Sequence, residues 1–295
     1  MSTYVVWGAI EIGLIYAIVA IGVFLTFNVL KFPDLTVDAS FPIGAAVVSS
    51  TILLGINPWF ATLLAVFASS FAGLITGLLT IRLGIVNILA SILTMIAAYS
   101  INIRIMGKPN IALFTEDTIF SALEHLDMDV IYLRPLLVTI LTLVIAIFVI
   151  RLLTSDFGLA LRATGINPKL VRSLGSNPKA HTYFLLMLSN GLVGLGGAVF
   201  AQANGFADVN SGIGTIVVGL AAVYIGKAMI KTRSLWVVIL AIIAGSIIYR
   251  FIIAIALNSS NLGLQASDLN FITAIMVVIA LMFPKIKLKW QLKYD

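Results

Sequence analysis

Long stretches without a charged residue dominate the chain. They occupy residues 12–30, 39–81, 83–103, 135–150, 182–207, 209–226, 234–249, 251–267 and 269–284. A transmembrane helix needs about 20 mostly apolar residues, and its backbone must satisfy its own hydrogen bonds in lipid. The pattern therefore predicts an all-α polytopic membrane protein. Its transmembrane helices, about nine in number, should cover about residues 5–27, 39–55, 58–81, 84–106, 135–153, 182–204, 210–230, 235–257 and 268–284.

The composition agrees with a membrane protein and removes several other classes. Of 295 residues, 61% are hydrophobic and 10% are charged, whereas a soluble domain averages about 25% charged residues. So few charges cannot cover a water-facing surface, which excludes a soluble enzyme. Disordered chains, collagen and coiled coils need polar or repetitive sequences. The chain contains no cysteine, which excludes disulfides, zinc–thiolate sites and iron–sulfur clusters.

The basic residues predict the orientation of the chain. If the N-terminus lies outside and the C-terminus lies in the cytoplasm, Arg104, Lys108 and Arg134 fall on outer segments. Fourteen others then fall on inner segments, as the positive-inside rule requires. These are Lys31, Arg82, Arg151, Arg162, Lys169, Arg172, Lys179, Lys227, Lys231, Arg233, Lys285, Lys287, Lys289 and Lys293. The external loop 107–134 is acidic, and residues 285–295 form a basic cytoplasmic tail. The pI of about 9.6 therefore reflects a cytoplasmic membrane face and not nucleic-acid binding.

The longest internal loop, residues 154–181, contains the signals of a short helix. Asn167 suits the N-cap and Pro168 the first helical position, while Gly175 suits the end of the helix. A helix over about 168–174 would present apolar and basic side chains on the inner side of the membrane. It is either a solvated connector that touches anionic lipid or a docking element for a cytoplasmic partner.

Two irregular stretches interrupt the apolar pattern, one in each half of the chain. Residues 32–42 contain Asp34, Asp38 and two prolines, and residues 204–215 contain Asp208 and several glycines. The first stretch could be an interfacial loop with aspartates that cap helices. Alternatively, interrupted segments at corresponding places in two halves indicate broken helices that line a translocation path.

Motifs of catalysis are missing from the sequence. His125 and His181 lie in loops predicted on opposite sides of the membrane, so they suggest no metal site, and none is expected. The sequence has no phosphate-binding GxxxxGK[ST] loop, nor a GxSxG or HExxH motif. We therefore expect a non-catalytic chain without a cofactor of its own. If transport is driven by ATP, the ATPase is a separate protein.

Together these segments resemble the permease subunits of ABC importers of the branched-chain amino-acid and ribose class. The likeness runs over most of the chain. Residues 34–41 are similar to the D-L-S-V-G-S segment of the sugar branch, and 161–165 with 174–175 resemble the cytoplasmic coupling loop. The stretches 13–23, 194–198 and 212–226 continue the resemblance in order. Residues 32–41 and 99–110 look like those of a subgroup associated with amino-acid uptake, aromatic amino acids among them.

The resemblance implies a type II ABC importer-like permease fold, with broken helices that line a central path within one permease domain, residues 1–295. It implies a homodimer of permeases in the cell's inner membrane. It also implies a cytoplasmic ATPase dimer that binds ATP and Mg²⁺, and an extracytoplasmic substrate-binding protein. Coupling to the ATPase would use Arg162, Asn167, Pro168, Lys169, Leu170, Val171, Arg172, Leu174 and Gly175. The translocation path would use Asp34, Thr36, Asp38, Ser40, Asn102, Arg104, Asn204, Asp208, Asn210, Ser211 and Thr215.

Asp38 departs from the sugar branch, which has glycine at this place. Its carboxylate could meet a substrate ammonium, pair with Arg104 or cap a helix, and an amino-acid substrate is favoured over a sugar. The rival hypothesis is an ion-coupled secondary transporter that uses Glu11, Asp34, Asp38 and Arg250 as an intramembrane relay.

Overall fold

Eight long helices make up most of the described residues of the protein, for which we have a computed structural model. The structure describes residues 3–121, 130–230, 232, 234–258, 274, 275 and 278. The long helices are α1 (Thr3–Phe24), α2 (Val37–Leu53), α3 (Pro58–Ile81), α4 (Asn87–Met106), α5 (Val130–Thr154), α8 (Pro178–Asn204), α9 (Thr215–Met229) and α10 (Leu235–Asn258). The shorter elements are the π-helix η1 (Leu25–Leu30), α6 (Asp156–Ile166), α7 (Pro168–Ser173), the 3-10 helix η3 (Val209–Gly212), and the strands β1 (Asn110–Ala112) and β2 (Phe206–Asp208).

The helices confirm the predicted all-α polytopic fold. Among the described residues, seven segments are long and apolar enough to cross a membrane, and α2 is a shorter apolar helix of 17 residues. These eight coincide with eight of the nine predicted spans. The ninth span, 268–284, lies outside the described residues apart from positions 274, 275 and 278. The tail 285–295 and residues 122–129 of the external loop lie outside them as well.

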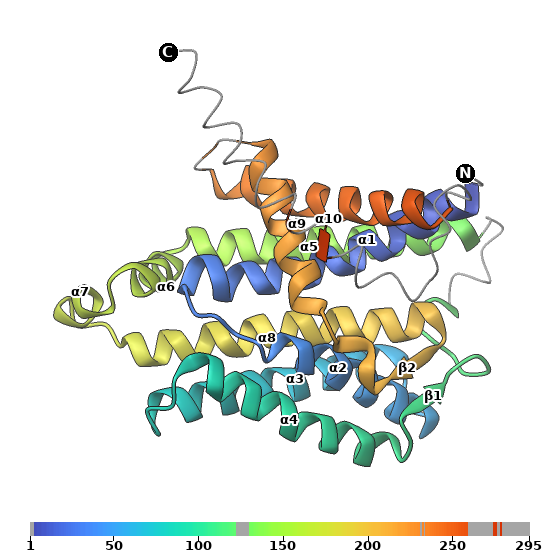
Figure 1. The fold of residues 1–295 in the computed structure, drawn as a ribbon, viewed down its shortest axis with the longest axis horizontal. Coiled ribbons are helices and arrows are strands. Elements are labelled where there is room, and N and C mark those ends of the chain that lie inside the picture. The colour runs from blue at the N-terminus through green and yellow to red at the C-terminus, as the bar shows by residue number, and fades with distance from the viewer. Residues whose placement is uncertain are drawn as a thin grey trace.

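Most of the long helices run roughly side by side between two ends of the molecule, whereas α9 crosses them at a steep angle (Figure 1). At one end α6 and α7 project from the bundle, and at the other lie the start of α1 and the two strands. The strands pair antiparallel, with Asn110 opposite Asp208, so the C-terminal ends of α4 and α8 meet there. The edge-to-face contact of Trp7 with Tyr132 brings the starts of α1 and α5 together at the same end. Loops that the sequence assigns to one side of the membrane thus share one end of the bundle.

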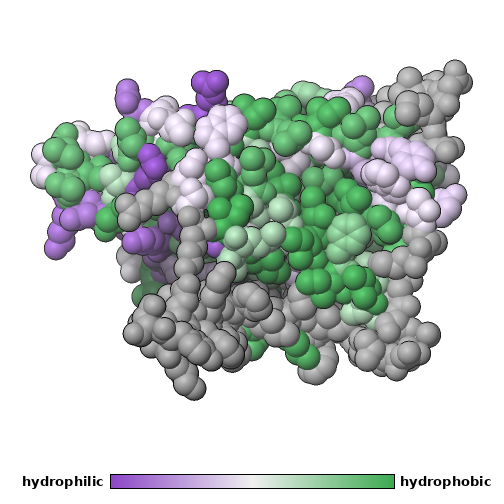
Figure 2. Space-filling view, turned by 90° about the horizontal axis from the view of Figure 1, so that it is seen from above, coloured by the Kyte–Doolittle hydropathy of each residue, from purple (hydrophilic) through white to green (hydrophobic). Residues whose placement is uncertain are grey.

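The surface has the character of a membrane protein. Figure 2 shows hydrophobic residues over the middle of the described face, while hydrophilic residues gather toward the end that carries α7. Large apolar side chains such as Leu93, Ile140 and Phe148 are exposed on the long helices. In water this exposure would be unfavourable, but in a bilayer it provides the lipid-facing surface.

Helix α8 lies at the centre of the packing and contacts α1, α2 and α3. The close approach depends on small residues, as is common between membrane helices. A Cβ added to Gly44 on α2 would clash with the backbone of Gly194 on α8, and one added to Gly197 would clash with the backbone of Phe41. The Gly-rich stripe of α8 therefore holds the beginning of α2 against the core.

The structure adds three features to the sequence predictions. The first span continues through η1 to Leu30 and ends at Lys31, whose φ of 56° is left-handed. An additional helix, α6, occupies the part of the internal loop between Thr154 and Asn167, and the Ser155 side chain accepts the Gly158 N–H at its start. The strands β1 and β2 also lie outside the prediction, because pairing between residues about 100 positions apart leaves no periodic signal in the sequence.

Candidate translocation path and coupling loop

The first irregular stretch leads into α2 through a buried carboxylate. Asp34 is fully buried, and its Oδ1 accepts the Thr36 N–H at 2.9 Å. Its Oδ2 accepts a hydrogen bond from Asn190 Nδ2 on α8 at 2.8 Å. The Asn190 Oδ1 in turn accepts the Ser40 hydroxyl at 2.6 Å. The start of α2 is therefore held to α8 by a continuous set of buried hydrogen bonds.

Hydroxyl groups extend this set toward α3 and α4. Thr36 Oγ1 lies 2.7 Å from Thr76 Oγ1, and Thr76 donates to Thr94 Oγ1 at 2.9 Å. Ser69 on α3 donates to the Ser40 carbonyl oxygen at 3.1 Å. All of these side chains are buried. Of the residues proposed for the path, Asp34, Thr36 and Ser40 thus face protein on every side and fix the helix break in place.

Asp38 joins the two irregular stretches. Its Oδ1 accepts the Ile216 N–H at 2.7 Å, and its Oδ2 accepts the Gly214 N–H at 3.4 Å. These amides belong to the first turn of α9, whose own N-cap residue is Gly214 and provides no side chain. A carboxylate suits this position because it pairs the free amides and faces the positive end of the helix dipole. Of the three roles considered for Asp38, helix capping is the one present here, and α2 supplies the cap for α9.

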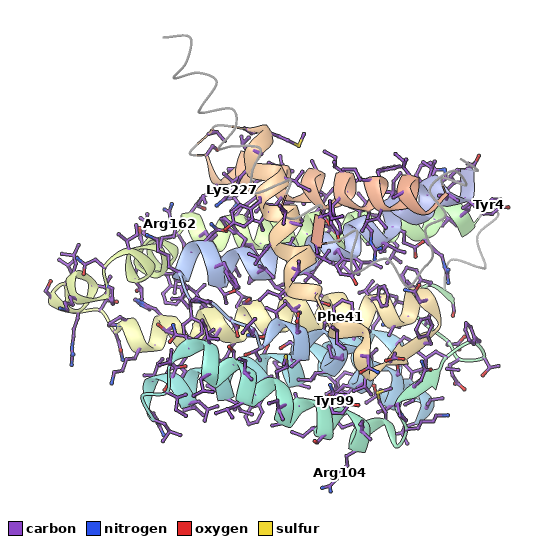
Figure 3. All side chains as sticks on the ribbon, viewed as in Figure 1. Tyr4, Phe41, Tyr99, Arg104, Arg162 and Lys227 are labelled. Carbon is purple, nitrogen blue, oxygen red and sulfur yellow. The ribbon has the colours of Figure 1, made fainter. Side chains whose placement is uncertain are left out.

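A cavity of about 420 Å³ lies beside this junction. Its polar lining includes the partly exposed Asp38 together with Tyr99, Ser100, Asn102 and Asn210. Its apolar lining is Ala39, Pro42, Met95, Ile96, Val209 and Ile213. Figure 3 shows Tyr99 on α4, away from both ends of the bundle. The volume of this cavity and its mainly apolar lining are typical of small-molecule sites, which occupy roughly 300–1,000 Å³.

Asn102 has an unusual environment within this cavity. Its side chain is 1% exposed, yet neither Oδ1 nor Nδ2 forms a hydrogen bond with another described residue. Leaving a buried donor or acceptor unpaired costs about 1–3 kcal/mol. Such a residue indicates a group kept for something other than stability of the fold.

A second cavity of about 410 Å³ adjoins the other side of the junction, and Ile213 lines both. It contains Thr215 and the charged residue Arg250 of α10. The Arg250 guanidinium lies 4.7 Å from the centre of the Tyr16 ring, an arrangement typical of a cation–π contact. Tyr16 stacks in turn on Phe41 of α2.

The four charged residues of the alternative relay occupy separate surroundings. Asp34 binds Thr36 and Asn190, Asp38 binds the backbone of α9, and Arg250 faces Tyr16. Among the described residues none of the three carboxylates, Glu11 included, forms an ion pair. A chain of directly contacting ionisable groups is therefore not part of the described structure.

The remaining path residues lie toward the end of the bundle that carries β1 and β2. Asp208 Oδ2 accepts from Asn110 Nδ2 at 3.2 Å, and Asp208 Oδ1 accepts the Asn210 N–H at 2.6 Å. Arg104 is exposed at the end of α4 and points away from the bundle (Figure 3). Asn204 lines a small outer cavity of about 230 Å³. The Ser211 hydroxyl is buried without a partner among the described residues.

The loop 154–181 has the helix that the sequence predicts. The Asn167 side chain accepts the Leu170 N–H at 3.1 Å, Pro168 occupies the first turn of α7, and Gly175 has a φ of +82°. Leu170 and Leu174 are 52% and 76% exposed. Lys169 and Arg172 are exposed as well, whereas Val171 is buried and Arg162 on α6 is partly buried. The tip of the bundle therefore presents two leucines beside basic groups.

His181 ties this loop to the core helix α8. Its Nδ1 lies 2.8 Å from Thr164 Oγ1 on α6, and its Nε2 lies 3.3 Å from Ser176 Oγ. The Phe157 ring packs edge to face on the imidazole. His181 on α8 is therefore in direct contact with α6 and with the turn that follows α7.

Some residues of the junction were not predicted from the sequence. Asn190 joins Asp34 to Ser40, because its amide donates to the first and its oxygen accepts from the second. Met95 and Ser100 line the cavity. An asparagine among the glycines of a long charge-free run is a signal that could have identified Asn190. The structure describes no group of three or more His, Cys, Asp or Glu that could hold a metal ion.

The chain is similar to several known proteins. The tyrosine transport system permease protein of Clostridioides difficile (strain R20291) is 40% identical over 265 residues, which cover 90% of this chain and 86% of that protein. An uncharacterized protein of Rickettsia prowazekii (strain Madrid E) is 34% identical over 277 residues, with coverage of 92% and 95%. The solved structure of PsaBC from Streptococcus pneumoniae in complex with Fab has the same fold, with a TM-score of 0.55, 14% identity and coverage of 95% and 91%.

The match to a protein family extends over most of the chain. The family described as the permease component of the branched-chain amino acid transport system matches residues 8–282. Fold, length and membrane spans agree with this match. The chain is therefore a member of this family of ABC transporter permeases.

Proposed function

We propose that this chain forms the translocation path of an ABC importer for an amino acid. The observation that carries the proposal is the cavity beside the junction of α2 and α9, where Asp38 and Asn102 stand among apolar residues. A carboxylate can receive the ammonium group that every amino acid carries, and a sugar has no such group. The 40% identity with a tyrosine transport permease supports the same substrate class.

The proposed complex contains two copies of the chain, a cytoplasmic ATPase dimer and an extracytoplasmic substrate-binding protein. ATP and Mg²⁺ would be bound by the ATPase, and the permease itself would be non-catalytic. The N-terminus would lie outside and the C-terminus inside, as the distribution of lysines and arginines requires. The exposed tip of α7 with Leu170 and Leu174 would enter a groove on the ATPase, with Lys169 and Arg172 at its rim.

Coupling in this proposal passes from α7 to the path through α8. The contacts of His181 link the inner loop to α8, and Asn190 on the same helix binds Asp34 at the start of α2. A shift of α8 would therefore move the beginning of α2, to which Asp38 and its capped helix α9 are joined. Such a movement would open the cavity alternately to the two sides of the membrane.

Uptake by proteoliposomes tests this function. The chain is reconstituted with the ATPase and the binding protein encoded beside it, and uptake of radiolabelled tyrosine is measured with and without MgATP on the cytoplasmic side. We expect accumulation that requires MgATP and both partner proteins. Uptake by the chain alone under an ion gradient would contradict the proposal and establish the secondary-transporter alternative.

A triple variant, Leu170→Asp, Arg172→Glu and Leu174→Asp, tests the docking role of α7. The exposed positions tolerate polar residues, so we expect a folded protein that no longer copurifies with the ATPase. Leu54→Asp is the matched control, because Leu54 is 78% exposed and lies in the turn at the C-terminal end of α2, outside the loop 154–181. Normal ATPase binding by the triple variant would remove α7 from the coupling interface.

A further inference from the structure

Two polar residues in the lining of the cavity at the junction, Asn102 and Asp38, have hydrogen-bonding capacity that no described residue uses. Asn102 is almost fully buried, and both its carbonyl oxygen and its amide nitrogen lack a partner among the described residues. Asp38 accepts two backbone N–H groups at 2.7 and 3.4 Å, whereas a carboxylate offers about four lone-pair sites. Asp38 at this cavity therefore has acceptor capacity left, and the buried Asn102 amide has an unused donor and an unused acceptor.

Most of the remaining lining is apolar or aromatic. Pro42 on α2 lines the cavity, and so do Met95, Ile96 and Tyr99 on α4. A six-membered ring packs favourably on Met and Tyr side chains.

We propose that Asn102 recognises the ring hydroxyl of an aromatic amino acid whose ammonium group faces Asp38. A phenolic hydroxyl both donates and accepts, so it would satisfy the two unpaired atoms of the Asn102 amide at once. An amino acid with an unsubstituted ring would fill the same space but leave this amide unpaired. The inference rests on the proposed function in taking the ligand to be an amino acid. It goes beyond that function by assigning selectivity to the permease itself.

Direct binding tests this assignment without the binding protein. The full chain is assembled with its ATPase in lipid nanodiscs, and equilibrium binding of radiolabelled tyrosine is measured by scintillation proximity. Unlabelled phenylalanine and 3-(4-hydroxyphenyl)propionate, which lacks the ammonium group, serve as competitors. We expect both competitors to bind about tenfold or more weakly than tyrosine, the scale of one hydrogen bond with a buried group.

Asn102→Leu is the decisive variant. It should lower the affinity for tyrosine about tenfold, to the level of phenylalanine, and leave the affinity for phenylalanine unchanged. Asn87→Leu is the matched control, because Asn87 lies on the same helix and outside the lining of this cavity. It should leave both affinities unchanged.

The outcomes separate this inference from the proposed function. If Asn102→Leu binds tyrosine as wild type does, or loses both ligands equally, the assignment of the hydroxyl to Asn102 is wrong. The same conclusion follows if wild type binds tyrosine and phenylalanine equally or binds neither. In each of these cases the function still stands if the complete complex takes up an amino acid with MgATP. If the complex takes up no amino acid, the proposed function is wrong.

Discussion

Two buried asparagines on different helices have opposite surroundings. Asn190 on α8 is fully buried, and its amide donates to Asp34 and to the Leu186 carbonyl while its oxygen accepts from Ser40. Asn102 on α4 is equally buried, but its amide has no partner among the described residues. A satisfied polar group in a core fixes one arrangement of helices, whereas an unsatisfied one reduces stability.

The contrast separates the scaffold of the path from the path itself. Residues around Asn190 hold the break between η1 and α2 in one position against α8. Residues around Asn102 line a cavity and leave hydrogen-bonding capacity unused. Similar residue types, asparagine and aspartate, therefore have different roles that only their partners distinguish. Four measurements can break or sharpen this comparison.

Asn190→Leu should have the largest effect on stability. It leaves an Asp34 oxygen and the Ser40 hydroxyl without partners in a buried place, each at a cost of about 1–3 kcal/mol. We expect the free energy of unfolding to fall by about 3 kcal/mol, measured by denaturation in detergent. Stability equal to that of wild type would show that the buried set of hydrogen bonds does not hold α2.

Gly44→Ala should have a smaller but clear effect. Its methyl group would meet the backbone of Gly194, so α2 must move away from α8. Overpacking of this kind costs typically 1–3 kcal/mol. Gly8→Ala is the matched control, because a Cβ at Gly8 would meet no atom within 4 Å beyond the nearby backbone of its own helix. This variant should leave the free energy of unfolding unchanged or slightly raised. Equal behaviour of the two variants would argue against close packing of α2 on α8.

Asn102→Leu should have the smallest effect on stability, with the opposite sign. Replacing an unpaired buried amide by an apolar side chain of similar size removes a cost. In the absence of ligand we expect the free energy of unfolding to stay within about 1 kcal/mol of wild type or to rise. A loss of the size expected for Asn190→Leu would show that Asn102 belongs to the scaffold after all.

The sequence predicted the parts of the fold that depend on local patterns. Charge-free runs gave the spans, and the Asn167–Pro168 pair marked a helix start that the structure confirms by a side-chain cap. Proline and glycine likewise placed both irregular stretches. Helix α6 was missed because its 11 residues, with Asp156 and Arg162 among them, are too few and too charged for the charge-free membrane spans on which the prediction relied.

Partners far apart in the chain could not be predicted in this way. The bonds from Asp38 to Ile216 and from Asp34 to Asn190 join residues 178 and 156 positions apart. Both carboxylates were assigned to the path on sequence alone, because a charge in an apolar region indicates function. Their surroundings differ: Asp34 is enclosed by its partners, while Asp38 also borders the cavity.

Thiol labelling of the cavity tests the central claim, that substrate passes beside the junction of α2 and α9. The natural chain has no cysteine, so Ser100→Cys places a single thiol on the lining and Ser69→Cys places one in the buried scaffold. The full complex in nanodiscs is treated with a small maleimide, with and without tyrosine. We expect labelling of the Ser100→Cys variant that tyrosine suppresses, and no labelling of the Ser69→Cys variant. Labelling at position 100 that no amino acid changes, or equal labelling at both positions, would contradict the account.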